Sequence, residues 1–181
     1  MQVAYAVVRA IGSDRIGIVE ELTAVIEKFG CNIKESKMAV LGGEFTIMML
    51  VSGKSDAVNY LFDHTFSAEV FKGFQIDVVK TEWPESSRTG VPYLIETVSL
   101  DSPGIVRAVT SLLADEQINI EELETDVSSA PFTGAPMFSM TIRIILSGPK
   151  KAMYLEEALH RLGYERDLNI RFHSLALSTR E

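Results

Sequence analysis

Two short segments of the chain combine an acid and a glycine three residues apart, in the pairs Asp14/Gly17 and Asp101/Gly104. In both places an apolar run ends and a helical pattern begins, so we expect the pair at the junction of a strand and a helix. A glycine there leaves the N–H groups of the helix start open, and the helix dipole favours a carboxylate beside them. The neighbouring aspartate could receive an ammonium group, so each junction would suit a small zwitterion such as an amino acid.

The same residues also have a structural explanation, and the residue types alone leave both open. Aspartate is a preferred helix N-cap, and Pro103 would stand in the first turn of the second helix, where its missing N–H costs nothing. Glycine fits this explanation less well, because inside a first helical turn it costs about 1 kcal/mol relative to alanine.

No catalytic or metal-binding constellation is visible. The chain has three histidines, His64, His160 and His173. They are not at metal-ligand spacing and accompany no nucleophile motif, so we expect surface or packing roles for them. Cys31 follows Gly30 at the expected end of a helix, where nothing lowers the pKa of a thiol. We therefore predict a protein that is not an enzyme and needs no metal or cofactor.

The elements that would position the two junctions repeat along the chain. Three segments recur in the same order in the second half, namely 14–19 as 101–106, 32–33 as 119–120 and 45–53 as 140–148. The offset is 87 residues for the first two matches and 95 for the third, so the second copy carries eight extra residues, and this surplus falls around the segment 130–136. Three matches in one order indicate an internal duplication.

Each copy is predicted to run strand, helix, strand, strand, helix, strand. In the first copy the apolar spacing places helices at 15–29 and 55–66, and strands at 3–11, 32–40, 44–51 and 74–81. In the second copy it places helices at 105–116 and 150–162, and strands at 93–100, 120–128, 137–146 and 168–177. In the second strand of the first copy, Ile33, Met38 and Val40 are expected to face inward.

This βαββαβ order is that of the ferredoxin-like split motif, an antiparallel sheet with both helices on one face. We therefore expect an α+β protein of two ferredoxin-like domains in tandem, at 1–82 and 93–178, with a linker of Pro, Gly and Ser at 83–92. Each core is small, so we expect the two copies to dock edge to edge or helix face to helix face. A homodimer could close the remaining sheet edges with two-fold symmetry.

The charge balance argues against direct binding of nucleic acid. The chain of 181 residues has 17 Lys and Arg against 25 Asp and Glu, a net charge of −8, so no basic excess is available to neutralise phosphates. Ferredoxin-like sheets can stack RNA bases on aromatic rings, but the strand aromatics here lack the basic residues of that pattern; they are Tyr5, Phe45, Tyr93 and Phe138.

The sequence also bears on location. A single cysteine allows no internal disulfide. The sequence contains no uninterrupted run of about 18 apolar residues, so it predicts neither a signal peptide nor a membrane span. We expect a cytoplasmic protein that does not bind a membrane.

The repeated segments resemble the ACT domain family, the small ferredoxin-like modules that sense amino acids. The resemblance rests on Asp14-Arg-Ile-Gly17-Ile-Val, on Gly30-Cys-Asn32-Ile and on the hairpin strands that follow, twice over, and it covers nearly the whole chain. The second copy adds the segments 118–123 and 130–138. With this insertion the chain resembles the tandem ACT proteins of the glycine cleavage system transcriptional repressor type.

The resemblance also implies ligand-binding residues, because ligands of paired ACT modules lie between the first loop of one module and the second strand of a neighbour. The first pocket would use Ser13, Asp14, Arg15, Ile16 and Gly17, with Asn32 and Ile33. The second would use Asp101, Ser102, Pro103 and Gly104, with Asn119 and Ile120. Arg15-Ile16 is replaced by Ser102-Pro103 in the second copy, so the two pockets need not share a ligand.

The function that the resemblance implies is a non-enzymatic regulator that binds a small amino acid, with glycine as the expected effector, and acts through a separate DNA-binding protein. One alternative is a detached regulatory subunit of an amino-acid metabolic enzyme. A second alternative is an accessory fragment of an enzyme, since ACT modules also precede a formyl-folate hydrolase domain. We expect no such catalytic domain, because the chain ends at Glu181, just after the last predicted strand.

Overall fold

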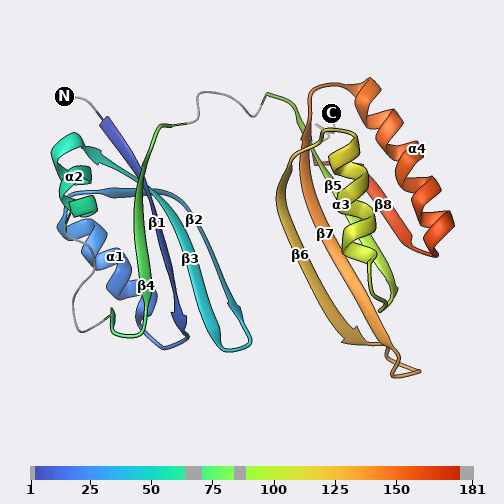
Figure 1. The fold of residues 1–181 in the computed structure, drawn as a ribbon, viewed down its shortest axis with the longest axis horizontal. Helices are drawn as coiled ribbons and strands as arrows, with labels where there is room; N and C mark the ends of the chain where they lie inside the picture. Colours follow the sequence, from blue (N-terminus) through green and yellow to red (C-terminus); the bar gives the residue numbers. More distant parts are fainter. Residues whose placement is uncertain (1–2, 64–70, 84–88, 176–181) are drawn as a thin grey trace, which may run out of the picture. The chain divides into compact units, whose positions relative to one another are not determined.

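A computed structural model of the chain describes residues 3–63, 71–83 and 89–175. The chain divides into two compact units, Met1–Glu85 and Ser86–Glu181 (Figure 1). Each unit is an independent βαββαβ arrangement, which confirms the predicted α+β class and the two ferredoxin-like folds.

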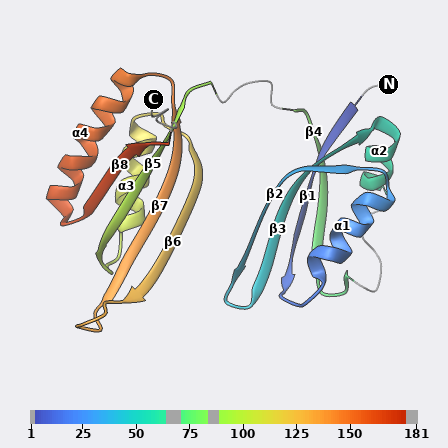
Figure 2. The same cartoon turned by 180° about the vertical axis from the view of Figure 1, so that it is seen from behind.

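The first unit has a four-stranded antiparallel sheet in the order β2-β3-β1-β4. Its elements in chain order are β1 (Val3–Ser13), α1 (Ile18–Lys28), β2 (Asn32–Leu41), β3 (Glu44–Lys54), α2 (Ser55–Asp63) and β4 (Gln75–Thr81). Both helices lie on the same face of the sheet, and the opposite face carries no helix of this unit (Figures 1 and 2). The last residues of the expected second helix and His64 lie outside the described residues.

The second unit repeats this topology, with the sheet order β6-β7-β5-β8. Its elements are β5 (Val91–Leu100), α3 (Ile105–Asp115), β6 (Ile120–Ser129), β7 (Pro136–Leu146), α4 (Pro149–Arg166) and β8 (Asn169–Ser174). Strand β5 begins two residues earlier than expected and so takes in the end of the segment that we expected to be linker. Helix α4 extends four residues beyond its predicted end.

Each unit has its own apolar core between the sheet and the two helices. The first core includes Ala6 and Val8 of β1, Leu22 and Ile26 of α1, and Leu61 of α2. The second core has the corresponding composition, with the fully buried side chains Ile95, Val109, Leu113, Ile142 and Leu159. Burial of the apolar helix faces against one side of the sheet therefore holds each unit together.

Met38 and Val40 of β2 lie opposite the buried Ile47 and Phe45 of β3, so they face the helix side of the sheet as expected. They are nevertheless 54% and 45% exposed, because β2 is the edge strand of its sheet. The register of β2 on β3 also shifts between Ile33 and Glu35, and a bulge of this kind moves all later side chains to the opposite face. The second unit has the same shift, between Ile120 and Glu122.

The extra residues of the second copy form a closed turn between β6 and β7. Ala130 N–H donates to Ala135 O at 2.8 Å, and Gly134 N–H donates back to Ala130 O at 2.9 Å. Phe132 stands at the tip of this turn and is completely exposed. In the first unit the corresponding turn consists only of Gly42 and Gly43, both at positive φ.

The starts of the first helix in each unit explain the repeated glycines. Gly17 and Gly104 are the N-caps of α1 and α3, with φ of 90° and 97°, and neither helix has a side-chain cap. The expectation that Asp14 and Asp101 are N-caps is therefore wrong, and so is the placement of Pro103 inside the first turn. Glycine is required because other L-residues are strained at this backbone angle.

This explanation predicts different effects for two glycines of the second unit. A Cβ at either Gly104 or Gly148 would meet no atom within 4 Å, and both are N-caps, but Gly148 has an extended φ of 175°. Gly104→Ala is expected to lower the free energy of unfolding by about 1–2 kcal/mol. Gly148→Ala should be neutral or stabilising by up to about 1 kcal/mol. Urea denaturation followed by circular dichroism measures both, and equal effects would contradict the backbone explanation.

Candidate ligand-binding loops

The loop between β1 and α1 is tied to the neighbouring hairpin by its backbone. Asp14 N–H donates to Gly43 O at 3.0 Å, and Glu21 N–H donates to Gly17 O at 3.0 Å as α1 begins. Ser13, Asp14 and Gly17 are exposed, and Ile16 is completely exposed. The loop thus presents a carboxylate, a hydroxyl and the uncapped start of a helix to solvent at one end of the unit.

Arg15 is the most constrained side chain of this loop. Its guanidinium donates two hydrogen bonds to the Glu21 carboxylate, one of them at 2.9 Å, and lies over the Phe74 ring at 5.7 Å from the centroid. The hydrogen bond from Arg15 lowers the pKa of Glu21 below its ordinary value, and the same bond raises the pKa of Arg15. The arginine therefore braces the loop against α1 and against Phe74, the residue just before β4.

The second loop keeps the backbone arrangement but lacks the brace. Asp101 N–H donates to Pro136 O at 2.9 Å, which is the counterpart of the bond from Asp14. Ser102 and Ala108 occupy the positions that correspond to Arg15 and Glu21, so no ion pair forms there. All four residues from Asp101 to Gly104 are exposed. The two loops share a backbone path and differ in the side chains that they offer.

Within one unit, the predicted second-strand residues do not meet the loop. Asn32 is paired with Ser52, which in turn lies opposite Tyr5, while the loop follows Ser13 at the other end of β1. Eight residues of strand separate Tyr5 from Ser13, or about 26 Å. The structure thus brings Ser13–Gly17 together but leaves Asn32 and Ile33 at the opposite end of the sheet.

The second unit repeats this separation. Ile120 lies opposite Ile144, which pairs with Tyr93 near the start of β5, whereas Asp101–Gly104 follow its end. Asn119, just before β6, donates from Nδ2 to the Glu121 carboxylate at 3.3 Å. A pocket of the expected composition therefore needs a loop and a second strand from two different modules.

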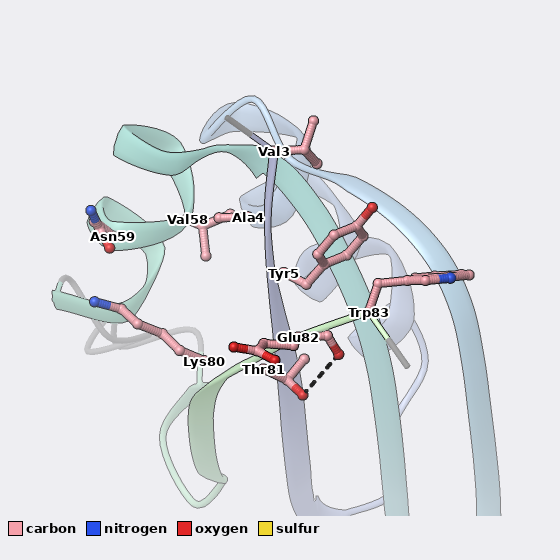
Figure 3. Close-up of a pocket in the computed structure, with 9 residues that line it drawn as sticks. All are labelled: Val3, Ala4, Tyr5, Val58, Asn59, Lys80, Thr81, Glu82 and Trp83. Atoms are coloured by element: carbon pink, nitrogen blue, oxygen red, sulfur yellow. Dashed lines mark hydrogen bonds between the residues drawn. The ribbon is translucent and has the colours of Figure 1, made fainter. Parts of the chain in front are cut away.

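A surface pocket that the sequence did not suggest lies in the first unit (Figure 3). It measures about 820 Å³ and is lined by Val3, Ala4, Tyr5, Val58, Asn59, Lys80, Thr81, Glu82 and Trp83. Tyr5 and Trp83 are in ring contact at 5.4 Å, and the Lys80 ammonium lies over the Phe62 ring at 4.6 Å from the centroid. None of the predicted site residues lines this pocket. The chain's only tryptophan, in a segment expected to be linker, is the signal that could have indicated it.

The remaining candidates for chemistry are dispersed. His160 and His173 are exposed, and His173 Nδ1 lies 3.9 Å from the Glu96 carboxylate. Cys31 is buried, and burial raises the pKa of its thiol. Within residues 3–63, 71–83 and 89–175, no group of three or more His, Cys, Asp or Glu side chains could hold a metal ion. In the same residues no helix combines the length and apolar character that a bilayer crossing requires.

The four strand aromatics Tyr5, Phe45, Tyr93 and Phe138 do not form a common platform on which RNA bases could stack. Phe45 and Phe138 are 1% and 7% exposed and belong to the two cores. Tyr93 packs against the second core and stacks on Phe172 at 4.9 Å. Only Tyr5 among the four lies away from the helices, so bases could not stack on these rings in a row.

The fold and the repeated strand–loop–helix junction define a tandem ACT-domain protein, and the ACT domain family model matches residues 4–65. The chain is 30% identical over 162 residues to the glycine cleavage system transcriptional repressor of Escherichia coli (strain K12), covering 87% of this chain and 83% of that protein. The chain belongs to the family of that repressor. This membership supports a regulatory role.

Two solved structures share the complete fold. The crystal structure of an unknown protein from Galdieria sulphuraria is 31% identical and matches with a TM-score of 0.80, covering 97% of this chain and 100% of that one. A crystal structure reported as a candidate glycine cleavage system transcriptional repressor is 22% identical, with a TM-score of 0.69 and coverage of 97% and 99%. At that identity the second likeness concerns the fold alone.

The brace between Arg15 and Glu21 predicts a pH dependence. Because the pKa of Glu21 is lowered in the folded protein, the pair stabilises the fold above the ordinary carboxyl pKa, and this contribution is lost as the pH falls through the lowered value. NMR titration should show the pKa of Glu21 returning toward its ordinary value in Arg15→Ala. Glu20→Gln leaves the contact in place and serves as the control. An unchanged Glu21 titration in Arg15→Ala would contradict the brace.

Proposed function

We propose that this chain is a non-enzymatic, amino-acid-responsive transcriptional co-regulator that acts through a separate DNA-binding protein. The observation that carries the proposal is the 30% identity over most of the chain to a glycine cleavage system transcriptional repressor. The net charge of −8 supports the division of labour, because the chain itself has no basic excess for DNA phosphates.

The two loops are the proposed ligand-binding elements. Neither α1 nor α3 has a side-chain cap, so first-turn N–H groups remain for a ligand carboxylate, apart from that of Ile18, which donates to Arg15 O at 3.5 Å. The exposed carboxylates of Asp14 and Asp101 stand beside these helix starts and can receive an ammonium group. A free amino acid has both groups, and the small size of the loops favours glycine or a similar ligand. Asn32 or Asn119 would come from a neighbouring module, because within one unit each lies too far away.

A thermal-shift screen against the twenty amino acids tests the ligand. A ligand at 100 times its Kd that binds only the folded state stabilises by about 2.7 kcal/mol, which corresponds to a shift of several degrees for a chain of this size. We expect a clear shift with glycine or another small amino acid.

Three single variants test which loop binds the ligand. Asp14→Ala should remove the thermal shift that arises from the first loop, and Asp101→Ala the shift that arises from the second. Asp115→Ala, at the end of α3, should leave the thermal shift unchanged. If no amino acid shifts the melting temperature, amino-acid sensing is wrong for this chain.

The proposed division of labour predicts how the chain behaves with DNA. The purified protein alone should not retard duplex DNA in a gel, even at low salt, where electrostatic binding is strongest. Retardation should appear only after the DNA-binding partner is added, and the chain should then move with that complex. Direct retardation by the chain alone would contradict the proposal, whereas assembly with a metabolic enzyme instead would favour the regulatory-subunit alternative.

A further inference from the structure

The pocket of the first unit lies where the edge strand β4 stops short of its neighbour. Strand β1 pairs with β3 from Val3 onward, but its pairing with β4 begins only at Tyr5, opposite Thr81. Alongside the first two residues of β1 the sheet therefore has no outer strand, and helix α2 borders this gap (Figure 3). Side chains from both faces of the sheet can line one pocket there, because no strand separates them.

The walls of the pocket are apolar on both faces of the sheet. Val58 of α2 is 1% exposed and belongs to the core, and Ala4 packs against the same core. On the other face, the Trp83 ring contacts Tyr5 at a centroid distance of 5.4 Å and remains 47% exposed. The pocket volume of about 820 Å³ lies within the range of small-molecule sites. The exposed part of Trp83 thus offers a ligand ring an aromatic surface on which to pack.

Two charged side chains line the pocket, and they differ in whether a partner already holds them. The Lys80 ammonium lies over the Phe62 ring, 4.6 Å from its centroid, so a cation–π contact holds it in place. No described residue forms an ion pair with the Glu82 carboxylate, which is exposed. Figure 3 shows this carboxylate on the side of Lys80 and Val58, among the lining residues. The charge that remains for a ligand is therefore negative.

These features select the charge of the ligand. An ammonium group could donate hydrogen bonds to Glu82, and bonds between charged groups are among the stronger ones. A carboxylate would be repelled by Glu82 and could bind Lys80 only by drawing it away from Phe62. The net charge of −8 also attracts cations to the chain. The pocket thus favours a cation that carries an aromatic ring.

We propose that this pocket binds a small aryl-alkyl amine, with its ring against Trp83 and its ammonium group on the Glu82 carboxylate. The first loop, Ser13–Gly17, lies at the other end of β1, so this site is separate from the one proposed for amino acids. The proposal does not depend on the ligand of the loops, and either can fail without the other.

Trp83 is the chain's only tryptophan, so its fluorescence reports directly on the pocket. The full-length chain is titrated with phenethylamine, with excitation at a wavelength that a phenyl ring does not absorb. The emission of Trp83 should change and then saturate. Hydrocinnamate has the same ring and two-carbon chain with a carboxylate in place of the ammonium, and it should bind at least about five-fold more weakly. L-Phenylalanine, which carries both charges, should also bind more weakly than phenethylamine.

Three variants test the role of the charges. Glu82→Gln keeps the size of the side chain and should raise the dissociation constant of phenethylamine about five-fold, the upper range for an exposed charge pair. Glu35→Gln removes another exposed carboxylate, on β2 and outside the pocket, and should leave the dissociation constant unchanged. Lys80→Gln should not weaken the binding, because the ligand does not use that ammonium. Circular dichroism confirms that each variant folds.

Three outcomes would overturn the proposal. The first is a Trp83 emission that phenethylamine does not change, or changes without saturation. The second is binding of hydrocinnamate or L-phenylalanine at least as tight as that of phenethylamine, which would mean that Lys80 receives a ligand carboxylate. The third is an equal effect of Glu82→Gln and Glu35→Gln on the dissociation constant.

Discussion

The positive φ of one glycine at the end of the first strand governs the architecture of each unit. Gly17 and Gly104 reverse the chain so that α1 and α3 start immediately after the loop and pack back along the sheet. The bonds from Asp14 N–H to Gly43 O and from Asp101 N–H to Pro136 O anchor the same loops to the neighbouring hairpins. The position of the exposed loop, and hence of any ligand bound there, depends on this turn.

The two copies have kept this backbone and diverged in side chains. The first loop is braced by Arg15, Glu21 and the Phe74 ring, whereas the second has no such pair. On the uncovered sheet faces, the ion pair of Arg9 with Asp77 in the first unit stands where the second unit pairs Glu96 with Arg171 across the strands. The loop between β6 and β7 has grown into a turn with Phe132 at its tip. Duplicated modules with similar cores can thus differ in their surface contacts, because the packing of the core does not determine the side chains on the opposite face of the sheet.

The proposed ligand-binding loop and the aromatic pocket of the first unit lie at opposite ends of one strand. The loop follows Ser13 at the end of β1, whereas Val3, Ala4 and Tyr5 at the start of β1 line the pocket together with Trp83. A ligand at the loop would therefore leave the pocket accessible.

The sequence by itself determined the duplication, the order of strands and helices, and the two loops, because these depend on local spacing and on residues such as Gly17 that recur in register. It could not place the N-caps, since aspartate and glycine are both good caps and only the backbone angle distinguishes them. It also grouped Asn32 with Ser13–Gly17, which lie about 26 Å apart within one unit, so only a second module could bring them together.

Tertiary structure alone decided which apolar residues stay outside the core. Met38 and Met48 have the same residue type and lie in β-strands, but the first is exposed at a sheet edge and the second on a face that no helix of its unit covers. The bulge after Ile33 also changes which face the rest of β2 presents. Period-two patterns give the alternation of a strand, but strand order, bulges and helix placement set which side is buried, and these arise from contacts between residues distant in sequence.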